Sequence, residues 1–112
     1  MKFLITGGSG FIGKYLVEEL SKIKNSKIYV IDKIKINFKA KNVLFIKGDI
    51  TKFNSLKKIN VSIDYIYHLA ADLGVEKIIN FPVESLNNNL LTTKNIIRFA
   101  KNQNKIKRIF FF

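Results

Sequence analysis

Three glycines near the amino terminus have a spacing that suits the binding of a diphosphate. Gly7, Gly10 and Gly13 lie between a short apolar run and a segment with helical periodicity. Gly7 would permit a tight turn, Gly10 would let the backbone approach a pyrophosphate, and Gly13 would let the helix pack closely on a sheet. The first helical turn, with Phe11 and Ile12, would present unpaired N–H groups and a partial positive charge to the phosphates. The alternative is a tight strand–helix turn that binds nothing.

An acidic residue follows this loop at the distance that dinucleotide binding requires. Asp32 lies 19 residues after Gly13, at the end of the next apolar run. A carboxylate at that position accepts the hydroxyl hydrogens of the adenosine ribose. Because it would also repel a 2′-phosphate, Asp32 favours NAD, whereas the neighbouring Lys33 and Lys35 leave NADP as the weaker alternative. A solvated carboxylate at a strand end is the bland interpretation.

Other residue types that carry chemistry are scarce. The chain has no cysteine, which excludes disulfides, thiolate nucleophiles and cysteine-based metal sites, and which fits a reducing compartment such as the cytoplasm. His68 is the single histidine, and no acidic cluster surrounds it in the sequence. We therefore predict a structural role for His68 and no metal site.

Short apolar runs alternate with segments of helical period. We expect strands at residues 2–6, 27–32, 43–47, 63–69 and 108–112. Such alternation predicts an α/β fold of the Rossmann type, a doubly wound parallel sheet with strand order 3-2-1-4-5 and a crevice beside the first strand. One dinucleotide-binding domain, residues 1–112, accounts for the whole length.

The helical segments are less uniform. We expect a long helix from Phe11 to about Asn25, a short one capped by Thr51 or Asn54 that ends at Ile59, and a loop with one helical turn at residues 72–81. A second long helix should run from Pro82 to about Asn102. The apolar residues expected on the buried faces of the two long helices are Phe11, Ile12, Tyr15, Leu16, Leu20 and Ile23, and Val83, Leu86, Leu90, Ile96, Ile97 and Ala100.

The charge balance invites a different hypothesis. The net charge is +12, but nearly all the basic residues are lysines, and they are scattered along the chain. Nucleic-acid-binding proteins more often cluster their charge and use arginine for bidentate contacts, so a basic nucleic-acid-associated protein is only the third alternative. No apolar run approaches the ~20 residues of a membrane span, and we expect no membrane partner.

Taken together, the motifs resemble the extended short-chain dehydrogenase/reductase superfamily in its NAD-dependent epimerase/dehydratase branch. The loop at residues 6–13 matches the form T-G-x-x-G-x-x-G, and Gly48-Asp49-Ile50 matches the segment after the third strand. His68-Leu69-Ala70-Ala71 matches the motif after the fourth strand. Residues 88–95 resemble the helix pattern N-N-x-x-G-T-x-N, with Thr92 where a glycine is usual.

The resemblance implies further cofactor contacts. In that family the side chain matching Asp49 and the backbone N–H matching Ile50 hold the adenine. Leu69, Ala70 and Ala71 would line the nicotinamide-side ribose and the pyrophosphate. For Asn89, a contact with the cofactor and a bond to neighbouring backbone both remain open.

The resemblance also implies a nucleoside-diphosphate sugar as the substrate of a full-length parent enzyme. Catalysis in the family depends on a Ser or Thr after the fifth strand and on a later Tyr-x-x-x-Lys pair. Tyr29 and Lys33 have that offset by coincidence, and the chain stops at Phe112, inside the fifth strand. We therefore expect a truncated fold that binds NAD, contains no catalytic residue and exposes an aromatic edge prone to self-association. A homodimer is a further expectation, and a noncatalytic NAD-sensing module is the second alternative.

Overall fold

A five-stranded parallel sheet forms the centre of the protein. The computed structural model describes residues 1–71 and 75–112. The strands lie in the order β3-β2-β1-β4-β5, and each neighbouring pair is parallel, which confirms the predicted topology. Their bounds are β1 (Lys2–Thr6), β2 (Lys27–Asp32), β3 (Val43–Lys47), β4 (Tyr65–His68) and β5 (Arg108–Phe111).

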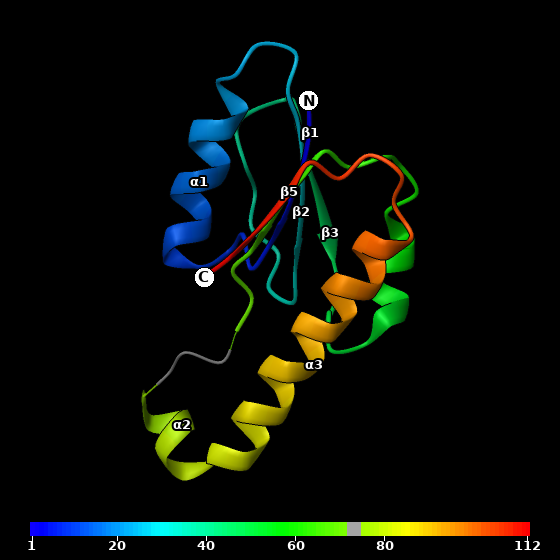
Figure 1. Ribbon diagram of the computed structural model, residues 1–112. Coiled ribbons are helices and arrows are strands. Elements are labelled where there is room, and N and C mark those ends of the chain that lie inside the picture. Colours follow the sequence, from blue (N-terminus) through cyan, green and yellow to red (C-terminus); the bar gives the residue numbers. More distant parts are fainter. Residues whose placement is uncertain (72–74) are drawn as a thin grey trace.

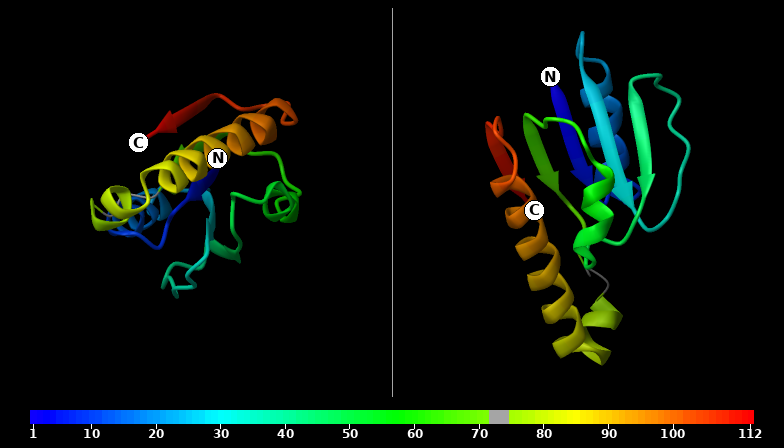
Figure 2. Two further views of the ribbon diagram at one scale, coloured as in Figure 1. Left: turned by 90° about the horizontal axis from the view of Figure 1, so that it is seen from below. Right: turned by 90° about the vertical axis from the view of Figure 1, so that its right-hand side faces the viewer.

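Helices cover the two faces of the sheet (Figures 1 and 2). Helix α1 (Phe11–Ser21) packs on one face, and the long helix α3 (Pro82–Lys101) packs on the other with the 3-10 helix η1 (Phe53–Lys58). The short helix α2 (Val75–Asn80) precedes α3, and Figure 1 shows both projecting past the ends of the strands. None of the helices in the described residues has the length and hydropathy of a membrane-spanning segment.

Alternate residues of β1 pack into two separate cores, as expected of a strand buried on both faces. Leu4 belongs to the cluster beneath α3 and η1, together with Ile31 of β2 and Ile66 of β4. Phe3 and Ile5 face α1 and pack with Val17 and Leu20. Because these central strands are fixed on both sides, the loops that follow them start from rigid positions.

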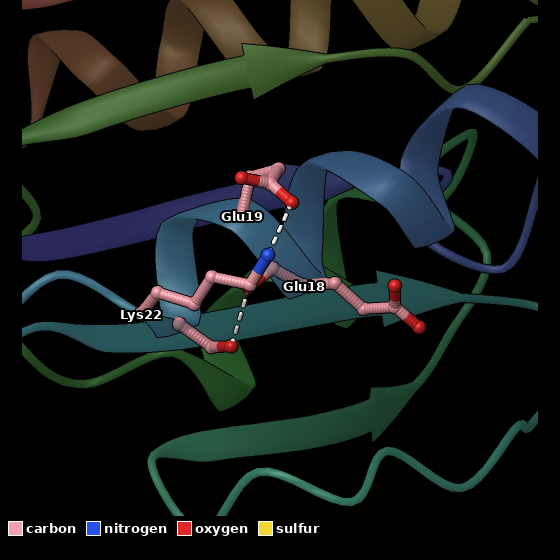
Figure 3. Close-up of polar contacts among 4 residues, drawn as sticks. Glu18, Glu19 and Lys22 are labelled. Atoms are coloured by element: carbon pink, nitrogen blue, oxygen red, sulfur yellow. Dashed lines mark hydrogen bonds and ion pairs between the residues drawn. The ribbon is translucent and has the colours of Figure 1, made fainter.

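Helix α1 ends at Ser21, four residues before the predicted end near Asn25. The following N–H groups of Lys22 and Ile23 bond to carbonyls three residues back, and Asn25 adopts a positive φ of 60°. The chain therefore leaves the helix through tight turns that periodicity does not reveal. At this end Lys22 reaches back to the Glu19 carboxylate, with Glu18 close by (Figure 3), and this hydrogen-bonded ion pair raises the pKa of Lys22 above its ordinary value.

The predicted buried faces of both long helices are partly wrong. In α1 the buried residues are Gly13, Val17 and Leu20, whereas Phe11, Ile12, Tyr15 and Ile23 are exposed. In α3 the buried set includes polar Ser85, Thr92 and Asn95 beside Ile96 and Phe99. Val83, Leu86 and Leu90 are exposed because the first half of α3 extends beyond the sheet. Ile97, in the second half, is also exposed, whereas the buried positions of α3 include polar residues.

Three shorter elements also differ in detail from the predictions. Strand β4 covers four residues and not 63–69. The segment before Ile59 is a 3-10 helix whose N-cap is Lys52, so neither Thr51 nor Asn54 caps it. Within the predicted loop at 72–81, α2 supplies the helical turn, and residues 72–74 lie outside the described part of the chain.

Candidate functional site

A cleft of about 290 Å³ opens at the edge of the sheet where the first four strands end. It lies at the point where the chain leaves β1 toward one face and β4 toward the other, the position at which doubly wound sheets bind their ligands. Its walls come from the glycine loop, the ends of β2 and β3, the segment after β4 and one face of α3. The lining residues are Gly7, Ser9, Gly10, Ile31, Asp32, Lys33, Ile34, Gly48, Asp49, Ile50, Thr51, Leu69, Ala70, Ala71, Asn88, Asn89 and Thr92.

The glycine loop adopts a backbone path that a side chain at Gly7 would block. Gly7 has a φ of +72°, and a Cβ there would lie 2.7 Å from the backbone nitrogen of Ala70. The Gly7 N–H donates to the Ile31 carbonyl at 3.0 Å, and its carbonyl accepts the Gly10 N–H at 3.2 Å. The predicted role of Gly7 in a tight turn is confirmed.

The other loop glycines divide into two kinds. A Cβ at Gly13 would collide with the carbonyl oxygen of Gly7 and lie 2.7 Å from the Gly8 Cα, so Gly13 lets the helix pack on the glycine loop and not, as predicted, on the sheet. Gly8 is also crowded, by the side chain of Val30. Gly10 is different: a Cβ there would meet only the Gly7 oxygen, at 3.4 Å. The fold does not need a glycine at position 10, which leaves that space open on the cleft side.

The first turn of α1 has donors for an outside acceptor. Gly10 is its N-cap residue and has no side chain, and no side-chain hydrogen bond caps the helix. The opening N–H groups of an α-helix have no partner within the helix, and the aligned peptide dipoles add a partial positive charge. The glycine loop therefore directs N–H groups and positive potential to one end of the cleft.

Asp32 joins the glycine loop to the end of β2. One carboxylate oxygen accepts the backbone N–H of Ser9 at 3.0 Å, and the other accepts the N–H of Ile34 at 3.0 Å. Ser9 in turn donates its hydroxyl to the Ile34 carbonyl at 2.6 Å. The carboxylate is half-buried, and each oxygen retains lone-pair capacity for a further donor.

Asp49 organises the far end of the cleft. One of its oxygens accepts both the backbone N–H of Thr51, at 3.0 Å, and the Thr51 hydroxyl, at 2.7 Å. Burial alone would raise the pKa of Asp49, but the two Thr51 hydrogen bonds and the charges of Lys33 and Lys52 lower it below its ordinary value. Asp49 is therefore an anion at neutral pH.

A single unused donor stands out in the segment from Gly48 to Lys52. The Gly48 N–H donates to the Asp32 carbonyl, the Asp49 N–H to Ser55 Oγ, and the Lys52 N–H to the Asp49 carbonyl. With Thr51 bonded as above, the N–H of Ile50 is the one for which the described residues supply no acceptor. Buried or half-buried backbone donors nearly always find a partner, so this N–H is suited to a ligand.

His68 lies beneath the opposite wall, at the centre of a hydrogen-bonded chain. The Thr6 hydroxyl oxygen accepts the Ala70 N–H at 3.2 Å and lies 2.7 Å from His68 Nδ1, so its proton can be donated to that nitrogen. Nε2 then carries the ring proton and faces Thr92 Oγ1 at 3.5 Å, and Thr92 donates to the Asn89 carbonyl at 3.0 Å. Burial lowers the pKa of His68. A neutral imidazole with both nitrogens engaged supports the predicted structural role.

The structure brings nine of the twelve predicted site residues into one cleft: Gly7, Gly10, Asp32, Asp49, Ile50, Leu69, Ala70, Ala71 and Asn89. Gly13 is buried beneath the loop, and the side chains of Phe11 and Ile12 point away into exposed positions, which leaves only their backbone for a ligand. Sequence reasoning missed Ser9, Ile34, Thr51 and Thr92. The position of Ser9 inside the glycine loop could have identified it as a site residue. Nothing in the sequence indicated that Thr92 lies on the face of α3 turned toward the cleft. No group of three or more metal-ligating side chains occurs among the described residues.

Comparison with known proteins gives a consistent family. Residues 3–112 match the NAD dependent epimerase/dehydratase family. A dTDP-D-glucose 4,6-dehydratase of Dictyostelium discoideum is 38% identical over 98% of this chain, and a UDP-glucose 4-epimerase of Rickettsia bellii is 30% identical over 95%. The chain spans 28% and 34% of the lengths of these relatives.

Solved structures agree with the sequence relatives. A UDP-glucose 4-epimerase from Bifidobacterium longum in complex with NAD+ and UDP has a TM-score of 0.85 and 25% identity, covering 99% of this chain and 36% of its own. The Bordetella bronchiseptica enzyme WbmF in complex with NAD+ has a TM-score of 0.85 and 28% identity, covering 98% and 35%. The match over residues 3–112, the strand order and the glycine loop with its acidic partner lead to one conclusion: this chain belongs to the NAD-dependent epimerase/dehydratase family.

Proposed function

We propose that this chain is the NAD-binding portion of a nucleotide-sugar epimerase or dehydratase. The observation that carries the proposal is the direct bond between the Asp32 carboxylate and the Ser9 N–H. Through it, the anion that would bind a ribose lies against the loop that would bind a diphosphate. When bound, NAD would supply a ring that takes up a hydride from the sugar and returns it. The names of the relatives support a nucleoside-diphosphate sugar as the substrate of the full-length protein.

The residues present fit such a cofactor. The N–H groups at the start of α1 would hold the diphosphate, and the Asp32 carboxylate would accept ribose hydroxyl hydrogens. At the far end, the unpaired Ile50 N–H is a donor and the free oxygen of Asp49 is an acceptor, and together they match the acceptor and donor on the edge of adenine. Leu69, Ala70, Ala71 and Asn89 would line the nicotinamide side. Asp32 favours NAD over NADP because a 2′-phosphate would lie against its negative charge.

We further propose that residues 1–112 contribute binding and not the acid–base groups of the reaction. Tyr29, which has the spacing of a catalytic tyrosine relative to Lys33, is 4% exposed and packed in the core beneath α3, where no substrate reaches it. His68 has both ring nitrogens engaged by threonines. Neither residue is therefore placed to exchange a proton with a sugar in the cleft.

A thermal shift with NAD tests this proposal. At ~100-fold over the dissociation constant, a ligand adds roughly 2.7 kcal/mol of stability, which raises the melting temperature of a domain of this size by ~10 °C or more. NADP at the same concentration should give a smaller shift. An unchanged melting temperature at saturating NAD would refute the proposed cofactor.

A further inference from the structure

Asn95, on the buried polar face of α3, contacts the loop at the adenine end of the cleft but does not line the cleft itself. Asn95 is 8% exposed, and its amide nitrogen donates to two consecutive carbonyls, those of Ile50 at 2.7 Å and Thr51 at 3.1 Å. These bonds span more than forty positions of sequence and connect α3 to the loop after β3. A planar amide that bonds to the carbonyls of two successive peptide groups, 50–51 and 51–52, fixes the orientation of both groups relative to α3.

The first of these two peptide groups is joined through the Ile50 Cα to the peptide that carries the unpaired donor of the site. This N–H belongs to Ile50, the residue whose own carbonyl Asn95 holds, and the Ile50 side chain is anchored in the core at 5% exposure. Ser55 and Thr51 bond to the Asp49 backbone and carboxylate from the other side. The loop is thus held in place before any ligand arrives, and Asn95 supplies the only side-chain donors from α3 that the described residues place on it.

We propose that Asn95 is a positioning residue that sets the selectivity of this site for adenine. The proposal rests on the proposed NAD site and concerns how its base-binding end is built. Adenine presents an acceptor at N1 beside a donor at the 6-amino group, which are complementary to the Ile50 N–H and the Asp49 carboxylate. Hypoxanthine presents a donor at N1 and an acceptor at position 6, so it opposes both groups. The ratio of the affinities for the two bases therefore reports how well the loop after β3 orients the Ile50 N–H and the Asp49 carboxylate.

The test compares ADP with inosine diphosphate, which share the ribose and the diphosphate. Calorimetric titrations would give the ratio of their affinities for the parent chain, for Asn95→Leu and for Asn87→Leu. Asn87 is an exposed residue of the same helix and does not line the cleft, so its variant carries the same chemical change away from the loop. We expect Asn95→Leu to reduce the preference for ADP by about fivefold or more, the worth of one well-oriented hydrogen bond, with Asn87→Leu unchanged.

If Asn95 had only a structural role, Asn95→Leu would weaken the binding of both nucleotides equally. An unchanged ratio of the two affinities in a folded variant would therefore overturn the proposal. If the parent chain binds neither nucleotide, the proposed function itself fails, which is a distinct result. Nuclear magnetic resonance of the parent chain covers the case in which Asn95→Leu does not fold. The side-chain amide protons of Asn95 should exchange slowly without ligand, and the Ile50 amide resonance should shift more with ADP than with inosine diphosphate. Fast exchange at Asn95, or equal shifts at Ile50, would contradict the inference.

Discussion

The carboxylate of Asp32 accepts the backbone N–H of Ser9 at 3.0 Å. This bond joins the end of β2 to the middle of the glycine loop, although the two residues lie 23 positions apart. Asp32 therefore has two roles in the proposed site. It orients the loop that would hold the diphosphate, and it presents the anion that would bind the ribose.

Replacing Asp32 with alanine should weaken NAD binding by about one to two orders of magnitude, because hydrogen bonds to charged groups are worth ~1.5–3 kcal/mol. NADP binding should fall less, since the variant also removes the repulsion of a 2′-phosphate. The measurement is a pair of calorimetric titrations with the two dinucleotides. Glu18→Ala, an exposed carboxylate on α1, is the matched control for net charge. An Asp32→Ala variant that keeps its NAD preference would contradict this role.

Substitution by alanine should affect stability at Gly7 and dinucleotide binding at Gly10. Gly7→Ala should lower the free energy of unfolding by at least ~1–2 kcal/mol, because alanine must adopt a positive φ and its Cβ would crowd Ala70. Gly10→Ala should leave stability nearly unchanged, since its φ of −74° is ordinary and the space is open, but it should weaken dinucleotide binding. Denaturant unfolding and NAD titration of both variants measure the contrast. If Gly10→Ala binds NAD like the parent, the open space at Gly10 does not serve a phosphate.

Much of this arrangement could be predicted from the sequence, because it depends on patterns within short segments of the chain. Short apolar runs indicate the strands, and glycines such as Gly7 indicate a backbone conformation that other residues rarely adopt. Strand order follows from the handedness of crossovers and needs no tertiary contact to be known. The positions of Asp32 and Asp49 at strand ends therefore placed both at one edge of the sheet.

What could not be predicted depends on long-range contacts. Thr92 and Asn95 are buried because α3 turns a polar face toward the cleft and the β3 loop, whereas amphipathic reasoning assigns burial to apolar residues. The packing partner of Gly13 could not be predicted either, since close packing on the glycine loop and close packing on the sheet both require a glycine. The end of α1 at Ser21 depends on turns held by individual hydrogen bonds.

Acid should destabilise the protein through His68. Burial lowers the pKa of His68 in the folded state, so the unfolded chain binds the proton more readily. Stability is then full above the unfolded pKa of about 6.5 and is lost as the pH falls through the folded value, at no more than ~1.4 kcal/mol per pH unit. Unfolding free energies measured from about pH 7 to about pH 5 should show this decline.

Because His68 is the single histidine, its replacement isolates the effect. His68→Gln should be less stable than the parent at pH 7, since it disrupts the chain from Thr6 to Thr92, but its stability should change little between about pH 7 and pH 5. An equal decline in the variant and the parent would show that other groups cause the acid sensitivity.

In the proposed site, backbone N–H groups around Gly10 bind a diphosphate while Asp32 binds the attached ribose. The most direct test of this arrangement is the calorimetric titration of NAD into the parent chain and into a Gly10→Val, Asp32→Ala double variant, with folding of the variant verified by circular dichroism. We expect saturable binding by the parent and loss of that binding in the folded double variant. Equal affinity of the two proteins for NAD would contradict it.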